Sequence, residues 1–252
     1  MDSKLADIIA ASRRIVFFGG AGVSTESGIP DFRSAGGLYN QSAGIDYAPE
    51  EIISHSFFVQ HTADFYDYYR KNLIYPEAKP NAAHLGLAAL ERAGKVSAVV
   101  TQNIDGLHQL AGSRRVLELH GSVLRNFCTK CGKAFGVETI LRADGIPYCD
   151  GCGGLIKPDV VLYEEPLNGQ VMEESVAEIA QADTLIVGGT SLVVYPAAGL
   201  VHSFRGKNIV LINKQATGFD SRATLTIREP IGEALAGFVA YDSTAQPHRS
   251  DD

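Results

Sequence analysis

The feature that most constrains this chain is a glycine-rich stretch directly after a short apolar run. The run is Ile15–Phe18, and the stretch from Gly20 to Arg33 reads GAGVSTESGIPDFR. Glycine lets the backbone turn tightly and bring amide N–H groups close to an anion. Such a loop, leaving a parallel strand and feeding a helix, can hold the pyrophosphate of a dinucleotide. The stretch therefore predicts a nucleotide-binding α/β fold.

The same stretch departs from the dehydrogenase fingerprint. Read as G-x-G-x-x-G, it places Thr25 at the last glycine position, and the downstream spacing of that motif is missing. We therefore expect the loop to bind a nucleotide through the same kind of backbone contacts, but for a reaction other than that of a dehydrogenase.

Composition narrows the class of protein. The chain has 252 residues, 45% of them hydrophobic and 20% charged, which is typical of a globular domain with or without an insertion. The formal net charge of −7 argues against direct nucleic-acid binding over the whole surface. No apolar run approaches the ~20 residues of a membrane span, and no signal-peptide core follows Met1. We expect a cytoplasmic protein with no membrane contact.

Four cysteines form two C-x-x-C pairs. They are Cys128 and Cys131, then Cys149 and Cys152, with 17 residues between the pairs. This spacing is typical of a zinc site. Two disulfides are the alternative, and a reducing cytosol disfavours them. Four sulfur ligands leave no open coordination position, so we expect one structural zinc ion per chain.

Six short apolar segments alternate with helical patterns along most of the chain. This order favours a doubly wound parallel sheet with inserts. The predicted strands are Ile15–Phe18, Val96–Val100, Val116–Leu119, Leu185–Val187, Ile209–Ile212 and Leu225–Ile227. The predicted helices are Ser3–Arg14, Glu50–Tyr75, Ala82–Ala93, Gly169–Gln181 and Ile231–Tyr241.

The segment Glu50–Tyr75 is rich in aromatic residues. Its rings favour a small helical module with its own core over a ligand-stacking role. Its place after the glycine stretch also suggests a lid. The rings belong to Phe57, Phe58, Phe65, Tyr66, Tyr68 and Tyr69.

Polar residues follow two predicted strands. The sequence TQNIDGLH begins at Thr101, and His120-Gly121 follows the next strand. Open α/β sheets bind ligands at the carboxyl ends of their strands. Turn capping by Asn103 and Asp105 is the alternative for the first group. Two successive strands delivering polar groups to one edge favour a site.

Taken in order, these motifs resemble the sirtuin family of NAD-dependent protein deacylases. The likeness rests on GAGVS-x-x-SGIPDFR, TQNID-x-LH, HG, the paired C-x-x-C motifs and Gly189–Ala197, and it covers nearly the whole chain. It implies a Rossmann-type doubly wound parallel sheet with an inserted zinc-binding module and a helical module. The implied bounds are 1–34, 80–121 and 158–252 for the NAD-binding domain, 35–79 for the helical module and 122–157 for the zinc module.

The resemblance also implies roles for residues. His120 is the expected general base, with Asn103 and Asp105 also catalytic, and a histidine suits a base that works near neutral pH. Peptide-flanking residues are expected to pair with an acyl-lysine protein or peptide through strand-like backbone bonds; they are Val160, Leu162, Tyr163 and Val193. The expected NAD contacts are Ala21, Gly22, Ser24, Thr25, Phe32, Arg33, Gln102, Ile104, Asp105, Gly189, Thr190, Ser191, Asn213, Lys214 and Ile231.

The chain departs from the family pattern at one loop. Where many members read Phe-Gly-Glu, this sequence has Tyr163-Glu164-Glu165. The missing glycine is expected to alter the loop that receives the acyl-lysine peptide. Sirtuins that prefer succinyl or malonyl lysine share a Tyr-x-x-Arg pair, which is out of register here in Tyr66–Arg70. We therefore expect a neutral acyl group, with acetyl preferred over succinyl.

Two other functions remain open at this point. An NAD-dependent oxidoreductase would bind NAD through the same kind of glycine-rich loop, but it would recycle the cofactor through NADH. A zinc-ribbon binding module without catalysis is disfavoured by the acidic net charge and by His120 and Asp105 at one edge.

Overall fold

A computed structural model describes residues 2–32, 37 and 47–241. The predicted NAD contact Arg33 lies outside these ranges. Within them, the helices are α1 (Ser3–Ala11), α2 (Pro49–Ile52), α3 (His55–Gln60), α4 (Thr62–Asn72), α5 (Ala82–Arg92), α6 (Leu107–Leu110), α7 (Val137–Arg142), α8 (Gly169–Gln181) and α9 (Ile231–Leu235). Short 3-10 turns are η1 (Ala21–Val23), η2 (Thr25–Ser27), η4 (Ala197–Ser203), η5 (Asp220–Arg222) and η6 (Ala236–Phe238).

Six parallel strands form the main sheet. In chain order they are β1 (Ile15–Gly19), β2 (Val96–Thr101), β3 (Val116–Glu118), β7 (Thr184–Gly188), β8 (Asn208–Ile212) and β9 (Leu225–Ile227). Their order across the sheet is β3-β2-β1-β7-β8-β9, so the chain leaves β1 in one direction and returns beside it in the other. This is the Rossmann order, and it confirms the predicted doubly wound sheet.

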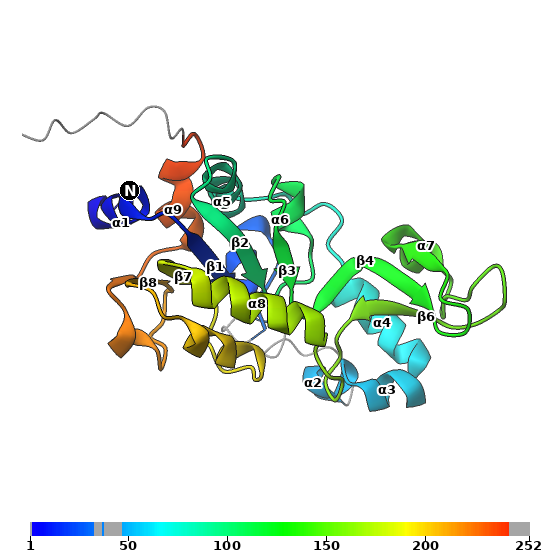
Figure 1. The fold of residues 1–252 in the computed structure, drawn as a ribbon. Helices are drawn as coiled ribbons and strands as arrows, with labels where there is room; N and C mark the ends of the chain where they lie inside the picture. The colour runs from blue at the N-terminus through cyan, green and yellow to red at the C-terminus, as the bar shows by residue number, and fades with distance from the viewer. Residues whose placement is uncertain (1, 33–36, 38–46, 242–252) are drawn as a thin grey trace, which may run out of the picture.

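Helices cover both faces of this sheet (Figure 1). Alternate residues of β1 supply the two cores: Ile15 and Phe17 pack with α1, α5 and α9, whereas Val16 and Phe18 pack with α8 and η4. A strand buried on both faces is apolar throughout, which explains the continuous run that the sequence shows.

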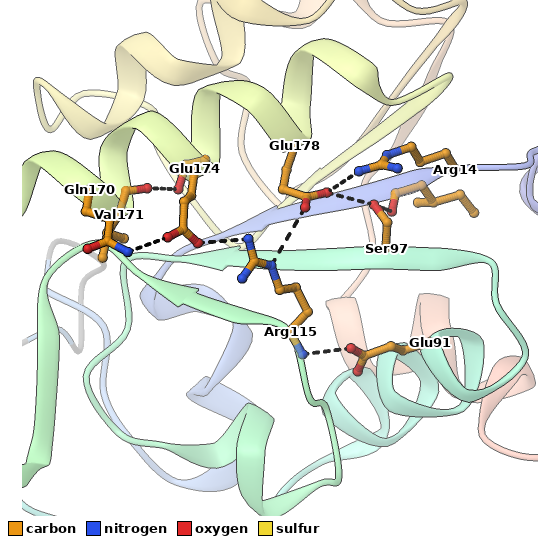
Figure 2. Close-up of polar contacts among 10 residues, drawn as sticks. Arg14, Glu91, Ser97, Arg115, Gln170, Val171, Glu174 and Glu178 are labelled. Atoms are coloured by element: carbon orange, nitrogen blue, oxygen red, sulfur yellow. Dashed lines mark hydrogen bonds and ion pairs between the residues drawn. The ribbon is translucent and has the colours of Figure 1, made fainter.

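A polar network fixes α8 across the starts of three strands (Figure 2). Glu178 is its centre: Oε2 accepts a hydrogen bond of 2.8 Å from Arg14 and one of 3.3 Å from Ser97, and Oε1 lies 3.7 Å from Nε of Arg115. Arg115 also donates to Glu174 at 2.8 Å. Ion-pair networks around a mostly buried carboxylate contribute more than isolated surface pairs, so this network stabilises the position of α8.

A second lobe lies beside the sheet and contains the cysteines (Figure 1). Its antiparallel sheet has the order β5-β4-β6, with β4 (Gly121–Cys128), β5 (Ala134–Gly136) and β6 (Ile156–Val160). The aromatic rings of α3 and α4 pack with side chains of this sheet in one shared core. The predicted core role of the rings is thus confirmed, but the helical segment and the cysteine segment share that core.

Several predicted elements differ from the structure. The segment after β1 forms the two short 3-10 turns η1 and η2, because close contacts with neighbouring loops replace a regular helix there. The predicted helix over 50–75 is three helices, since Ser54 caps α3 and the chain turns again at His61. The first helix ends at Ala11, and the final helix continues beyond α9 only as η6.

Candidate active site

The glycine stretch meets the end of β7 at the point where the strand order reverses. The amide of Gly22 donates to the carbonyl oxygen of Gly189 at 2.8 Å. A Cβ on Gly22 would lie 2.8 Å from the Cα of Gly189, and one on Gly189 would collide with the amide of Val23. Gly189 also has φ +59°, which favours glycine. The two loops therefore form a side-chain-free surface at the position where Rossmann folds bind dinucleotides.

A buried polar cluster lies beside this surface. The Ser24 hydroxyl donates to Oδ2 of Asp105 at 2.6 Å, and the side-chain amide of Asn103 donates to Ser24 Oγ at 3.1 Å. Burial raises the pKa of Asp105 against the opposing effect of the bonds from Ser24 and the Leu107 amide. The bond from the Leu107 amide shows that Asp105 also makes a turn contact just before α6, as the turn-capping alternative expects, whereas the Asn103 side chain bonds to Ser24 instead.

A second set of bonds joins the ends of β2, β7 and β8. The Gln102 side chain donates to Thr190 Oγ1 at 3.1 Å. Asn213 accepts from the Thr190 amide at 3.1 Å and donates to the Thr190 carbonyl at 2.9 Å. Three of the predicted NAD contacts, from three strand ends, are therefore in direct contact.

His120 lies between β3 and β4 and faces the same edge. Its Nδ1 is 3.0 Å from the carbonyl oxygen of Gln102. A carbonyl only accepts hydrogen bonds, so Nδ1 carries the proton and Nε2 keeps its lone pair. Burial lowers the pKa of His120 despite the opposing effect of this bond. The ring is therefore neutral at pH 7, with a basic nitrogen available.

The remaining predicted NAD contacts have varied surroundings. Thr25 donates to the carbonyl of Gly22 at 3.0 Å. Phe32 and Ile104 pack against the shared core of the second lobe, and Ile231 lies in the core on one face of the main sheet. The other three stay open to solvent at least in part: Ala21, Ser191 and Lys214.

The predicted peptide-flanking residues divide into two kinds. Val160 and Leu162 are buried in the shared core, so their side chains are unavailable at the surface. Tyr163 is 38% exposed and Val193 is 57% exposed. The loop after β6 and the loop after β7 each contribute one accessible residue.

The four cysteines converge at one point of the second lobe. Their sulfur atoms all lie within 4.8 Å of one another, and the cysteines are free thiols. Cys128 and Cys152 are 3.4 Å apart at sulfur, and Cys131 and Cys149 are 3.7 Å apart. A tetrahedral zinc ion with bonds of about 2.3 Å places its sulfur ligands about 3.8 Å apart. The donor set therefore fits a structural zinc ion and rules out the disulfide alternative.

Comparison with known families agrees with this geometry. A sequence profile described as the Sir2 family matches residues 20–196, which run from the glycine stretch through the loop after β7.

The chain belongs to the Sir2 family.

Bacterial sirtuins resemble this chain over almost its whole length. An NAD-dependent protein deacetylase of Clostridium perfringens is 59% identical over 234 residues, covering 92% of this chain and 96% of the relative. An NAD-dependent protein deacetylase of Cutibacterium acnes is 56% identical over 233 residues, covering 92% and 95%.

Solved Sir2 structures share the fold. A Sir2 homologue in complex with NAD has a TM-score of 0.83 and 40% identity, covering 95% of this chain and 93% of that one. A Sir2 complex with a p53 peptide and NAD+ has a TM-score of 0.81 and 40% identity, covering 93% and 96%. A Sir2 variant with deacetylated p53 peptide and 3'-O-acetyl ADP ribose also has a TM-score of 0.83 and 40% identity, covering 92% and 95%.

Two side chains that contact the sirtuin glycine loop or its neighbours were not predicted from the sequence. The Asn81 side chain donates to the Val23 carbonyl at 2.8 Å and to Ser27 Oγ at 3.0 Å, besides capping α5. Glu26 accepts from the amide of Gly232 at 2.7 Å. The Pro-Asn pair before α5 indicates only the helix cap, and nothing in the sequence links Glu26 to a residue 206 positions later.

Proposed function

We propose that this sirtuin removes the acetyl group from protein lysines by transferring it to the ADP-ribose part of NAD, with release of nicotinamide and consumption of one water molecule. The observation that carries the proposal is the bond of neutral His120 to the carbonyl of Gln102, the residue directly before Asn103 in the Ser24–Asn103–Asp105 cluster. Membership of a family whose relatives are NAD-dependent protein deacetylases supports the same reaction.

The residues present fit NAD. The close approach of Gly22 and Gly189 leaves a side-chain-free surface on which a pyrophosphate could lie, as in other Rossmann loops. Asn213 and Thr190 support the adenosine end, together with Ser191 and Lys214. Bound NAD would supply an electrophilic ribose carbon and nicotinamide as the leaving group.

The protein's own contribution is orientation, exclusion of water and proton transfer. Asp105 and Asn103, fixed through Ser24, would hold the nicotinamide carboxamide. A pocket that excludes bulk water would protect the reacting carbon from premature hydrolysis. Nε2 of His120 would take a proton from a ribose hydroxyl so that the oxygen can attack the acyl group.

The substrate is an acetyl-lysine segment lying between two loops. The backbone N–H and C=O of Glu164 and of Val193 make no hydrogen bond within the described part of the chain. Two such segments can pair with a third, extended one by strand addition. The complex of a relative with a p53 peptide supports this proposal.

We also propose the division of the chain into an NAD-binding domain, a helical module and a zinc module at the bounds given by the sequence. The zinc ion is structural in this proposal, since four sulfur ligands leave no position for substrate. None of the helices in the described ranges combines the length and hydropathy needed to cross a bilayer. We propose a cytoplasmic location because thiolates stay reduced there.

The test separates this reaction from the oxidoreductase alternative. The protein is incubated with NAD and with either an acetylated or an unmodified lysine peptide, and nicotinamide and NADH are measured. Nicotinamide release that requires the acetyl group, without NADH, is expected. NADH formation, or nicotinamide release independent of the acetyl group, would contradict the proposal.

A further inference from the structure

Glu164 has a backbone conformation that its side chain disfavours. Its φ is +75°, and within the described ranges only Leu192 shares a positive φ among residues other than glycine. The Cβ of an L-residue makes this left-handed region unfavourable, whereas glycine enters it freely. Glu164 therefore needs another means of holding a turn that glycine would adopt without a steric penalty.

The Glu164 side chain provides that means. Its Oε2 accepts a hydrogen bond of 2.8 Å from the amide of Ser56. Ser56 is the second residue of α3, and the first amides of a helix have no partner within the helix. Hydrogen bonds from Ser56 also lower the pKa of the Glu164 carboxyl, so it is ionised at neutral pH. A charged acceptor on a backbone amide is among the stronger single contacts available.

The residues on either side of Glu164 are fixed independently. The Tyr163 amide donates to the Ile53 carbonyl, and the Tyr163 carbonyl accepts from His55, both at 3.0 Å. Glu165 accepts from His55 Nδ1 at 2.8 Å and from Lys157 Nζ at 3.1 Å. Losing the Glu164 carboxylate therefore changes the conformation of one residue while the loop keeps its other attachments.

That one residue lies in the loop after β6, directly after Tyr163, one of the predicted peptide-flanking residues. Its own N–H and C=O make no hydrogen bond in the described part of the chain, unlike those of Tyr163. A change of φ would turn both groups away from their present direction. A peptide that pairs with them would lose those bonds or would have to restore the turn on binding.

We propose that the Glu164 carboxylate is a positioning group for the acyl-lysine peptide: by binding the Ser56 amide it holds Glu164 in the left-handed conformation that presents its backbone to the substrate. This proposal rests on the proposed deacetylase function. It assigns Glu164 a role in peptide affinity and none in NAD binding or in the proton transfer at His120.

Three substitutions separate the carboxylate from the backbone conformation. Glu164→Gln keeps an acceptor oxygen at the same distance. Glu164→Gly removes the acceptor but enters the left-handed region freely, and Glu164→Ala removes the acceptor while keeping the Cβ penalty. Glu51→Ala is the matched control, because Glu51 is an exposed acidic residue of α2 whose side chain makes none of the contacts described above.

The first readout is steady-state deacetylation with KM measured separately for peptide and for NAD. We expect peptide KM to rise about threefold to tenfold in the Ala variant, less in the Gly variant, and little in the Gln and Glu51→Ala variants. NAD KM and kcat should stay close to those of the unsubstituted protein. An Ala variant with unchanged peptide KM, or Gly and Ala variants equally impaired, would overturn the proposal while the deacetylase function stands.

The second readout needs no activity. Amide hydrogen exchange at Ser56 should be slow in the unsubstituted protein and in the Gln variant, and about tenfold faster in the Ala and Gly variants, because Glu164 is the partner of this amide. Equal exchange in all variants would show that the Glu164 carboxylate does not bind the Ser56 amide. If the unsubstituted protein fails to deacetylate, the proposed function fails. The exchange measurement still decides whether the hydrogen bond between Glu164 and the Ser56 amide exists.

Discussion

The Nδ1 atom of His120 lies 3.0 Å from the carbonyl oxygen of Gln102, an atom that can only accept a hydrogen bond. This contact fixes the tautomer and leaves Nε2 as the basic nitrogen. The Gln102 side chain also donates to Thr190, so one residue positions both the proposed base and a predicted NAD contact.

Replacing His120 should remove catalysis and leave NAD binding intact. His120→Ala is expected to lower kcat by about two to four orders of magnitude, the usual contribution of a general base. NAD affinity, measured by calorimetry, should change little. His202→Ala, which removes an exposed histidine outside the candidate site, is the control. Near-normal turnover in the His120 variant would exclude this residue as the base.

The pH profile gives an independent test of the same residue. Burial lowers the pKa of His120, so the neutral base should persist below the ordinary value of 6.5. We expect kcat/KM to stay level down to that pH and to fall below it as the ring is protonated. A fall that begins above pH 7 would mean that another group limits the reaction.

Folding stability should fall in mildly acidic solution because of two other histidines. His84 and His108 are buried with their rings 4.7 Å apart. Burial lowers the pKa of His84 from 6.5 to about 4, and burial and then His84 lower the pKa of His108. The unfolded chain binds protons below pH 6.5 while the folded chain does not, so stability is full above pH 6.5 and is lost toward pH 4.

Urea unfolding between pH 7 and pH 5 measures this loss. Each histidine should contribute a slope of up to about 1.4 kcal/mol per pH unit below its unfolded pKa. His84→Gln keeps an acceptor at the third helical position of α5, where His84 Nδ1 now accepts from the Asn81 amide, and removes one titrating group. The slope should fall by about half in this variant. An unchanged slope would show that other groups cause the pH dependence.

Loss of one cysteine should release the metal and loosen the second lobe. Cys128 is buried in the core that the cysteine segment shares with α3 and α4. Cys128→Ala should contain no zinc and should melt at a lower temperature, because metal binding contributes folding free energy. Elemental analysis of protein purified without chelator should give one zinc per chain. Metal-free protein that is stably folded would refute the structural site.

The acyl pocket should reject a distal carboxylate. Tyr66 donates to the Ile156 carbonyl, and Arg70 donates to the carbonyls of Ile140, at 2.8 Å, and of Gly145. These side chains join α4 to the second lobe, so neither is free to bind a succinyl group. A carboxylate entering without such partners loses its solvation.

Competition between acylated versions of one peptide decides this point. Acetyl-lysine should be removed faster than succinyl-lysine. Butyryl-lysine, which has the same number of carbons as succinyl without the charge, separates the effect of size from that of charge. Faster succinyl than butyryl removal would show that a cation does reach the pocket.

Sequence reasoning succeeds where one residue type is required by local chemistry. Buried strands such as Ile15–Phe18, the spacing of the cysteines and the polar residues after β2 are local patterns, and the structure confirms the sheet and the cysteine cluster. The links of Glu26 to Gly232 and of Glu164 to Ser56 were not predictable, because they join segments that only the tertiary fold brings together. Helix breaks at Ser54 and His61 were missed because the aromatic pattern continues through them.

The most direct test of the central claim is mass spectrometry of an acetyl-lysine peptide incubated with the protein, with and without NAD. We expect the peptide to lose its acetyl group only when NAD is present, with one nicotinamide and one O-acetyl-ADP-ribose formed for each peptide converted. Deacetylation without NAD, or an unchanged peptide with NAD present in a zinc-loaded and folded protein, would contradict the account.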